Sequence, residues 1–160
     1  DKAAKDAEKI ARILKALARS PEGKFKTPVG WFVTANEPTA EQRGVVKEVA
    51  VREGVTIHCL SFKQLQGRTL HSVARGKAYD VDTVTNDRVT IHVQDGGRTR
   101  VRFRDDLEPF YRKLVLSGEL TAADLQSVYV FNTAPAATIL AAMEGVSTET
   151  HPIHLYYRRP

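Results

Sequence analysis

The chain has 160 residues, of which 42% are hydrophobic and 27% are charged, and its net charge is +5. This composition is that of an ordinary globular protein and excludes a fibrous or disordered chain. No apolar run approaches the roughly 18 residues of a membrane span, and no signal-peptide pattern is present. The single cysteine, Cys59, excludes an internal disulfide. We therefore expect a cytoplasmic protein without membrane contact.

The positive charge is concentrated in the first half of the chain. Residues 1–76 hold 14 Lys and Arg against 8 Asp and Glu, whereas residues 77–160 hold 10 against 11. An excess of cations favours a polyanionic partner for the first half. Residues 68–77 are polar and have no clear hydrophobic period, so we expect one domain over residues 1–76 and a second over residues 77–160.

A helix of high intrinsic propensity is predicted over Lys2–Ala18, which is rich in Ala, Lys, Leu and Glu. Apolar residues at helical spacing predict its core face: Ala7, Ile10, Ile13, Leu14 and Leu17. At about 100° per residue, a basic stripe falls on the opposite side: Lys2, Lys5, Lys9, Arg12 and Arg19. The stripe fits either a surface that faces phosphates or a solvated helix face.

A strand–helix–strand unit follows the first helix. Val29–Val33 is a short apolar run, typical of a strand buried on both faces. Thr39 and Gln42 have the spacing of a capping box, and Gly54 marks the end of the helix that they begin. Val55–Leu60 is the second strand. Two strands joined through a helix form a parallel crossover unit, so the first domain is predicted to be α/β.

Three alternating runs after residue 77 predict β-strands: Tyr79–Val84, Val89–Val93 and Arg98–Arg104. The last two should form a β-hairpin around Asp95-Gly96-Gly97. A two-residue loop would mix charged and apolar side chains on one face. A three-residue loop sets Ile91 against Val101 and keeps one face apolar, so the three-residue loop is predicted.

That register would leave a row of arginines on the other face of the hairpin: Arg98, Arg100, Arg102 and Arg104. Their guanidinium groups would be about 6.8 Å apart along the strand. Such a row could follow a phosphate backbone or pair with carboxylates of a partner chain. It could equally be a solvated face that discourages edge pairing.

The remaining chain predicts three helices and a hairpin. The first helix starts at Asp105-Asp106, the second at a Thr121–Asp124 capping box and the third near Thr133, and the hairpin covers Val146–Tyr157. With the segment GELTAADLQ...NTAPAATILAAMEGV, this order resembles the winged-helix family, so a small winged-helix-like α+β module is expected over residues 105–157. A competing interpretation makes residues 128–131 a strand, which conflicts with the resemblance.

The charges of this module do not favour DNA reading. The helix that begins near Thr133 carries no Lys or Arg, and residues 105–150 hold two basic side chains against seven acidic ones. DNA phosphates repel an acidic surface. We therefore expect protein contact here, with DNA contact only through the chain end: Tyr156, Tyr157, Arg158 and Arg159.

A second resemblance covers residues 2–70. A basic helix, then WFVTANEPTAEQR, a helix and a strand ending in CLSF look like the later half of Mrr-like restriction endonuclease domains of the PD-(D/E)XK group. The resemblance implies a nuclease fold that often occurs in prokaryotic defence proteins. In that family a catalytic aspartate and a (Glu/Gln)-x-Lys strand precede the basic helix. Glu22-Gly23-Lys24 has this spacing but lies in a loop without a partner aspartate.

No catalytic residue, metal site or cofactor site is therefore predicted. The sequence has no Gly-rich phosphate loop, paired-cysteine zinc pattern or nucleophile elbow. Three functions stay open: a non-catalytic DNA-binding protein derived from a nuclease fold, an assembly domain that meets an acidic partner chain, and a fragment of an active Mg²⁺-dependent endonuclease whose catalytic residues precede Asp1. We favour the first.

Overall fold

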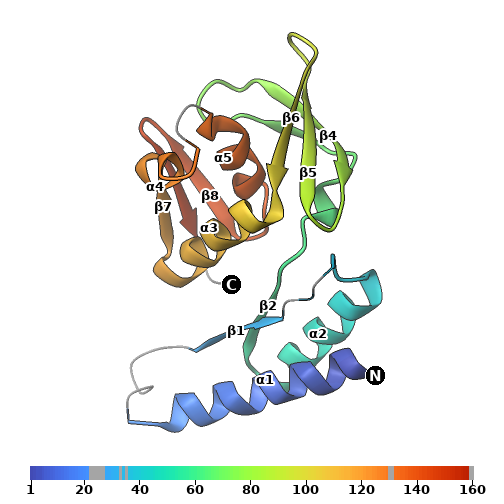
Figure 1. Ribbon diagram of the computed structural model, residues 1–160. Helices are drawn as coiled ribbons and strands as arrows, with labels where there is room; N and C mark the ends of the chain where they lie inside the picture. Colours follow the sequence, from blue (N-terminus) through green and yellow to red (C-terminus); the bar gives the residue numbers. More distant parts are fainter. Residues whose placement is uncertain (22–27, 33, 35, 130–131, 159–160) are drawn as a thin grey trace. The chain divides into compact units, whose positions relative to one another are not determined.

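The chain forms two compact units, Asp1–Ser61 and Phe62–Pro160, in a computed structural model that describes residues 1–21, 28–32, 34, 36–129 and 132–158 (Figure 1). The division between the units lies earlier than the boundary predicted near Gly76. The physical reason is that residues 62–76 pack and pair with the strands that follow them. The described residues form five α-helices and three small sheets, a mixed α/β architecture.

Helix α1 covers Lys2–Arg19, and the Asp1 side chain caps it by accepting a hydrogen bond from the backbone N–H of Ala3. Its buried face differs in part from the predicted one. The buried residues are Ala3, Ala7, Ala11 and Leu14. Ile13 and Leu17 are about half exposed, at 51% and 50%. The helix turns its small side chains inward, where another helix packs closely against it.

Strands β1 (Val29–Phe32) and β2 (Thr56–Cys59) are parallel, with helix α2 (Ala40–Glu53) between them, so the predicted crossover unit is confirmed. The capping box of Thr39 and Gln42 is present at the start of α2. Gly54 ends the helix at φ 64°, a left-handed conformation that glycine adopts without strain.

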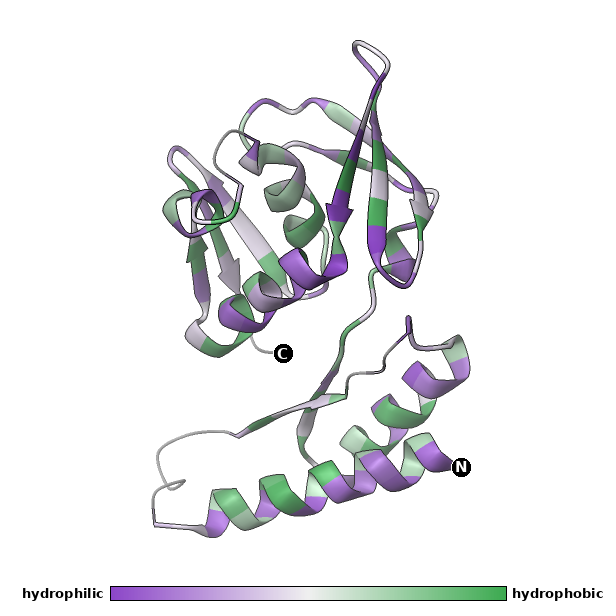
Figure 2. Ribbon diagram, in the orientation of Figure 1, coloured by the Kyte–Doolittle hydropathy of each residue, from purple (hydrophilic) through white to green (hydrophobic). Residues whose placement is uncertain are grey.

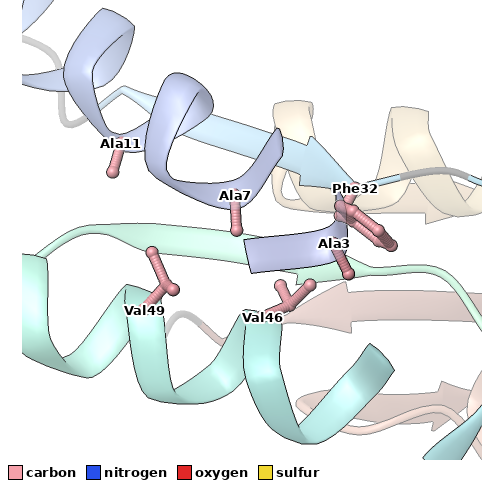
Figure 3. Close-up of a cluster of buried hydrophobic side chains, with 6 residues drawn as sticks. All are labelled: Ala3, Ala7, Ala11, Phe32, Val46 and Val49. Carbon is pink, nitrogen blue, oxygen red and sulfur yellow. The ribbon is translucent and has the colours of Figure 1, made fainter. Parts of the chain in front are cut away.

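The core of the first unit lies between the two helices and the sheet. Ala3, Ala7 and Ala11 of α1 meet Val46 and Val49 of α2 beside Phe32 (Figure 3). Ile10, Ile57 and Cys59 pack against this cluster. Small side chains at the contact let the two helices approach closely.

Strand β1 alternates between half-buried and buried residues rather than being buried on both faces as predicted. Gly30 and Phe32 are buried, whereas Val29 and Trp31 are half-buried. A Cβ atom at Gly30 would overlap Ile10 Cγ2 and lie 3.1 Å from Leu14 Cδ1. The glycine therefore lets α1 lie directly on the strand, and this one face of the sheet carries the core.

The second unit begins with a four-stranded antiparallel sheet of order β3-β4-β5-β6. A short 3₁₀ turn at Lys63–Leu65 precedes it. Strand β3 falls in a stretch that has no sequence period and was not predicted. The strands are β3 (Thr69–His71), β4 (Ala78–Val84), β5 (Arg88–Val93) and β6 (Arg98–Phe103).

The register of the β5–β6 hairpin corrects the prediction. Val93 pairs with Arg98, so four residues lie between the paired ends, and Ile91 faces Arg100 instead of Val101. Gly96 and Gly97 both have positive φ, at 134° and 62°, which permits this longer loop. Apolar and arginine side chains consequently share the inner face of the sheet, and the predicted clean separation of faces is wrong.

The rest of the second unit is a helical module with a three-stranded sheet of order β7-β9-β8. The three predicted helices, the Thr121–Asp124 capping box and the final hairpin are present, and strand β7 is an addition. Their bounds are α3 (Arg104–Ser117), β7 (Glu119–Thr121), α4 (Ala122–Gln126), α5 (Thr133–Ala141), β8 (Val146–Thr150) and β9 (Ile153–Tyr157). The alternative strand at residues 128–131 lies partly outside the described residues.

The core of the second unit consists of large aliphatic side chains. Fully buried members include Ile91, Leu107, Leu114, Leu120, Leu125, Ile139, Leu140 and Leu155. Helix α5 is hydrophobic along most of its length (Figure 2), and its six consecutive residues 135–140 are all buried. A helix buried on every side is a core element.

Candidate nucleic-acid interface

The basic stripe of α1 is a continuous solvent-facing surface. All five cations of the stripe are exposed: Lys2, Lys5, Lys9, Arg12 and Arg19. Within the described residues, none of them lies in an ion pair. The predicted residues of the first helix therefore come together on one face, opposite the alanines that pack on α2.

Two other cations of the first unit, Lys15 and Arg52, form ion pairs instead of facing solvent alone. Lys15 Nζ lies 2.7 Å from Glu53 Oε2, and Arg52 Nη2 lies 2.7 Å from Glu8 Oε1. These pairs join α1 to α2, and the hydrogen bonds from Lys15 and Arg52 lower the pKa of the Glu53 carboxyl. Glu8 and Glu53 are thus engaged beside the stripe, while the cations of the stripe remain in solvent.

The arginines of β6 do not form the solvent-facing row that was predicted. Arg98, beside the hairpin loop, is exposed and Arg100 is half-buried. Val101 and Phe103 instead face outward, at 36% and 52% exposure. The shifted register causes this exchange, because it places Arg100 and Arg102 on the face that packs against the helical module.

Arg102 is held within its own unit. Its Nη2 donates to the backbone carbonyl of Asn132 at 2.7 Å, and its guanidinium lies 4.9 Å from the centre of the Tyr129 ring. Burial lowers the pKa of the Arg102 guanidinium and raises that of Tyr129 to about 12. An arginine stem can cover apolar surface while an aromatic face and a carbonyl receive its charge. Arg102 therefore supports the fold.

Arg104 is the first residue of α3 and is buried, at 4% exposure. Its Nε lies 3.7 Å from Glu108 Oε2, and the other oxygen of this carboxylate lies 2.6 Å from Arg112 Nη2. Glu108 thus sits between two arginines at i, i+4 spacing. A side chain in this environment cannot reach a phosphate backbone, so only Arg98 of the predicted four-arginine row is exposed.

A polar cluster that the sequence analysis missed lies where β1 and β2 end. Ser61 Oγ donates to Glu37 Oε2 at 2.7 Å, and Arg43 Nη1 donates to the Pro38 carbonyl at 2.6 Å. Arg43 Nη1 also lies 3.4 Å from Ser61 Oγ. The carboxyl ends of parallel strands are where open α/β folds bring polar side chains together, and this rule could have identified the cluster. These contacts tie the end of β2 to the start of α2.

Helix α5, which would be the reading helix of a winged-helix module, is largely buried. Thr133 and Ala134 are half-buried, and the residues that follow them in α5 are buried. Helix-turn-helix proteins read base edges with side chains at the start of an exposed second helix. At the chain end, Tyr156 donates to Glu149 at 3.1 Å and stacks on His154, with ring centres 4.4 Å apart.

Glu22-Gly23-Lys24, the segment with the nuclease spacing, lies outside the described residues. Within the described ranges, no group of three or more His, Cys, Asp or Glu side chains gathers in a geometry suited to a metal ion. Among the helices of those ranges, none combines the length and hydrophobicity that a membrane crossing requires. Comparison with family models, curated proteins and solved structures finds no match for this chain.

Proposed function

We propose that the first unit binds the phosphate backbone of DNA through the exposed face of α1. The observation that carries this proposal is the set of solvent-facing cations on that face, without ion-pair partners in the described part of the chain. From Lys2 to Arg12 the stripe is about 15 Å long, which suits contact with several successive phosphates. Such contacts give affinity without sequence preference.

The proposed activity is non-catalytic. The resemblance to the later half of an Mrr-like nuclease supports a DNA-facing role for the basic helix that precedes WFVTANEPTAEQR. The residues that hold Mg²⁺ and activate water in that family have no match in this sequence. We therefore propose a nuclease-derived binding protein or subunit, with a role in prokaryotic defence as the setting that the resemblance suggests.

Protein contact is the second candidate function, and it concerns the second unit. The order of three helices and a hairpin after β6 supports a winged-helix-like module, but burial of α5 removes the surface with which such modules read DNA. The excess of acidic residues over residues 105–150 also disfavours phosphates. Both observations favour a partner protein for this unit.

A mobility-shift titration with duplex DNA over a range of salt concentrations tests the first proposal. The variant Lys5→Gln/Lys9→Gln should weaken binding to all duplex sequences alike, because it removes two phosphate contacts. It should also reduce the slope of log affinity against log salt by about 2.

The matched control is Lys47→Gln/Lys77→Gln, which removes the same charge from exposed positions outside the stripe. This control should retain the wild-type slope. Equal loss in the two double variants would mean that net charge alone attracts DNA, and absence of a shift with wild-type protein at low salt would refute the proposal.

A further inference from the structure

A cleft of about 440 Å³ opens in the second unit among β3, α5 and β8. Six consecutive residues, 68–73, line it, so the cleft follows the whole length of β3. Helix α5 and its C-cap contribute Thr138, Ala141 and Ala142, whose spacing places them on one side of the helix and whose side chains are small. The volume lies within the range of ligand pockets in proteins.

The β3 wall of the cleft is a sheet edge. Strand β3 stands at the end of its sheet and pairs with β4 on one side. The bonds from Ser72 N to Lys77 O, 2.8 Å, and from Val81 N to Arg68 O, 2.9 Å, show that alternate residues point their backbone groups toward β4. The N–H and C=O groups of Thr69 and His71 therefore point the other way.

The β8 wall is an edge as well. Strand β8 is the last strand in the order β7-β9-β8, and Val146, Ser147 and Thr148 line the cleft. The bond from Arg158 N to Gly145 O, 2.9 Å, sets the phase of the β8–β9 ladder. By the same alternation, the backbone groups of Thr148 point away from β9. Backbone donors and acceptors of two different sheets thus border one cleft.

The charge of the lining is positive. Arg68 and His71 line the cleft, and the lining includes no Asp or Glu. The Arg68 side chain has no ion-pair partner among the residues that the structure describes. An occupant with a carboxylate would complement this wall, and alternating N–H and C=O groups would satisfy the strand edge. A DNA backbone offers hydrogen-bond acceptors alone and carries the same negative charge at every phosphate, whereas an extended peptide offers both donors and acceptors and is the better fit.

We propose that the cleft binds an extended acidic segment of a partner protein, which pairs with β3 as an added strand and places a carboxylate against Arg68. This inference rests on the protein-contact role proposed for the second unit and is independent of DNA binding by α1. Main-chain hydrogen bonds would provide affinity, and the Arg68 contact would select the side chain.

Panning a library of random peptides against the intact chain, followed by polarisation measurements with the enriched peptides, tests the inference. We expect acidic, β-branched peptides to be enriched. Arg68→Glu and Ala142→Phe should each weaken their binding by about tenfold or more, because the first reverses the charge and the second fills the cleft. Lys47→Glu makes the same charge change outside the cleft and should leave binding unchanged.

N-methylation of the peptide backbone gives a second measurement that does not depend on protein variants. Methyl groups on the amides that face β3 should abolish binding, whereas methyl groups on the intervening amides should be tolerated. If peptides bind wild type and both cleft variants with equal affinity, the second unit still contacts proteins, but the cleft is not the binding site. Failure to enrich any peptide, or displacement of the peptide by oligothymidine, would also overturn it, while DNA binding by α1 would be unaffected.

Discussion

The two units bury apolar surface with different side chains and therefore treat their charges differently. The first unit packs Ala3, Ala7 and Ala11 against two valines, so its helices lie close and their charged faces stay outside. The second unit packs leucine and isoleucine between a sheet and a helical module. This unit also buries Arg104 and half-buries Arg102.

This difference shows that an arginine's place in an alternating strand does not decide its role. The five stripe cations of α1 remain exposed because the helix buries the opposite side, which carries its alanines. The hairpin register turns Arg102 of β6 toward Tyr129, and Arg104, at the start of α3, lies against Glu108. Function is therefore more readily inferred from cations opposite a well-defined core face than from cations on a strand whose register is unknown.

The largest loss of stability is expected from truncating a buried leucine in the aliphatic core of the second unit. Leu114 in α3 is fully buried, so Leu114→Ala should lower the free energy of unfolding of that unit by about 3 kcal/mol. All five tyrosines lie in this unit, so their near-ultraviolet circular dichroism during denaturant unfolding measures the change.

Leu116→Ala is the matched control on the same helix, because Leu116 is 61% exposed. It should change the unfolding free energy by less than about 0.5 kcal/mol. Equal costs for the two substitutions would contradict the assignment of Leu114 to the core. A parallel loss of the Trp31 signal would show that the two units unfold together.

A smaller effect is expected from enlarging the alanine contact of the first unit. Ala7 is fully buried between α1 and α2, so Ala7→Leu should destabilise this unit by about 1–3 kcal/mol through overpacking. The only tryptophan, Trp31, lies in β1, and its fluorescence during unfolding reports on this unit. Ala16→Leu, at an exposed position of the same helix, should have little effect. A stabilising Ala7→Leu would reveal spare volume and contradict close packing.

The smallest effect is electrostatic and belongs to the second unit. Lys113 donates to the Asp124 carboxylate at the start of α4, and this hydrogen bond, with one from the Thr121 backbone, lowers the pKa of Asp124 to about 2. A lowered folded-state pKa stabilises the fold above the unfolded value near 3.8, and this contribution is lost as the pH falls toward 2.

Asp124→Asn should therefore be less stable than wild type by up to about 1 kcal/mol at neutral pH, the range for a surface pair. The difference should close between pH 4 and pH 2, and it should be absent from the tryptophan signal of the first unit. A gap that persists below pH 2 would show that the cost comes from packing rather than from charge. Thermal unfolding of wild type and Asp124→Asn at a series of pH values measures this stability difference.

The elements that sequence patterns predicted well are those with local signals. The capping boxes at Thr39 and Thr121, the stop at Gly54 and the helix from Thr133 are all present, because caps and left-handed glycines act within a few residues. Strand β3 was missed because its three residues obtain their structure from pairing with β4.

The candidate sites divide in the same way. The basic stripe of α1 followed from helical spacing, since 3.6 residues per turn and an alanine core face leave one side for the cations. The burial of Arg102 and Arg104 was not predictable, because it depends on the loop length at Gly96-Gly97 and on Tyr129, which lies far along the chain. The cleft beside β3 was not predictable either, because its lining comes from segments that are far apart in the sequence: residues 68–73, 138–142 and 146–148.

By itself, the sequence determined the helices, their caps, the parallel crossover and the side of α1 on which positive charge collects, because each depends on near neighbours along the chain. Tertiary structure alone decided the strand register, whether the β6 arginines face solvent or pack inside the unit, the burial of α5 and the meeting of two sheet edges at one cleft. Those features arise where distant segments compete for the same apolar surface, and the outcome depends on side-chain volume and on hydrogen-bond partners that only the folded chain brings together.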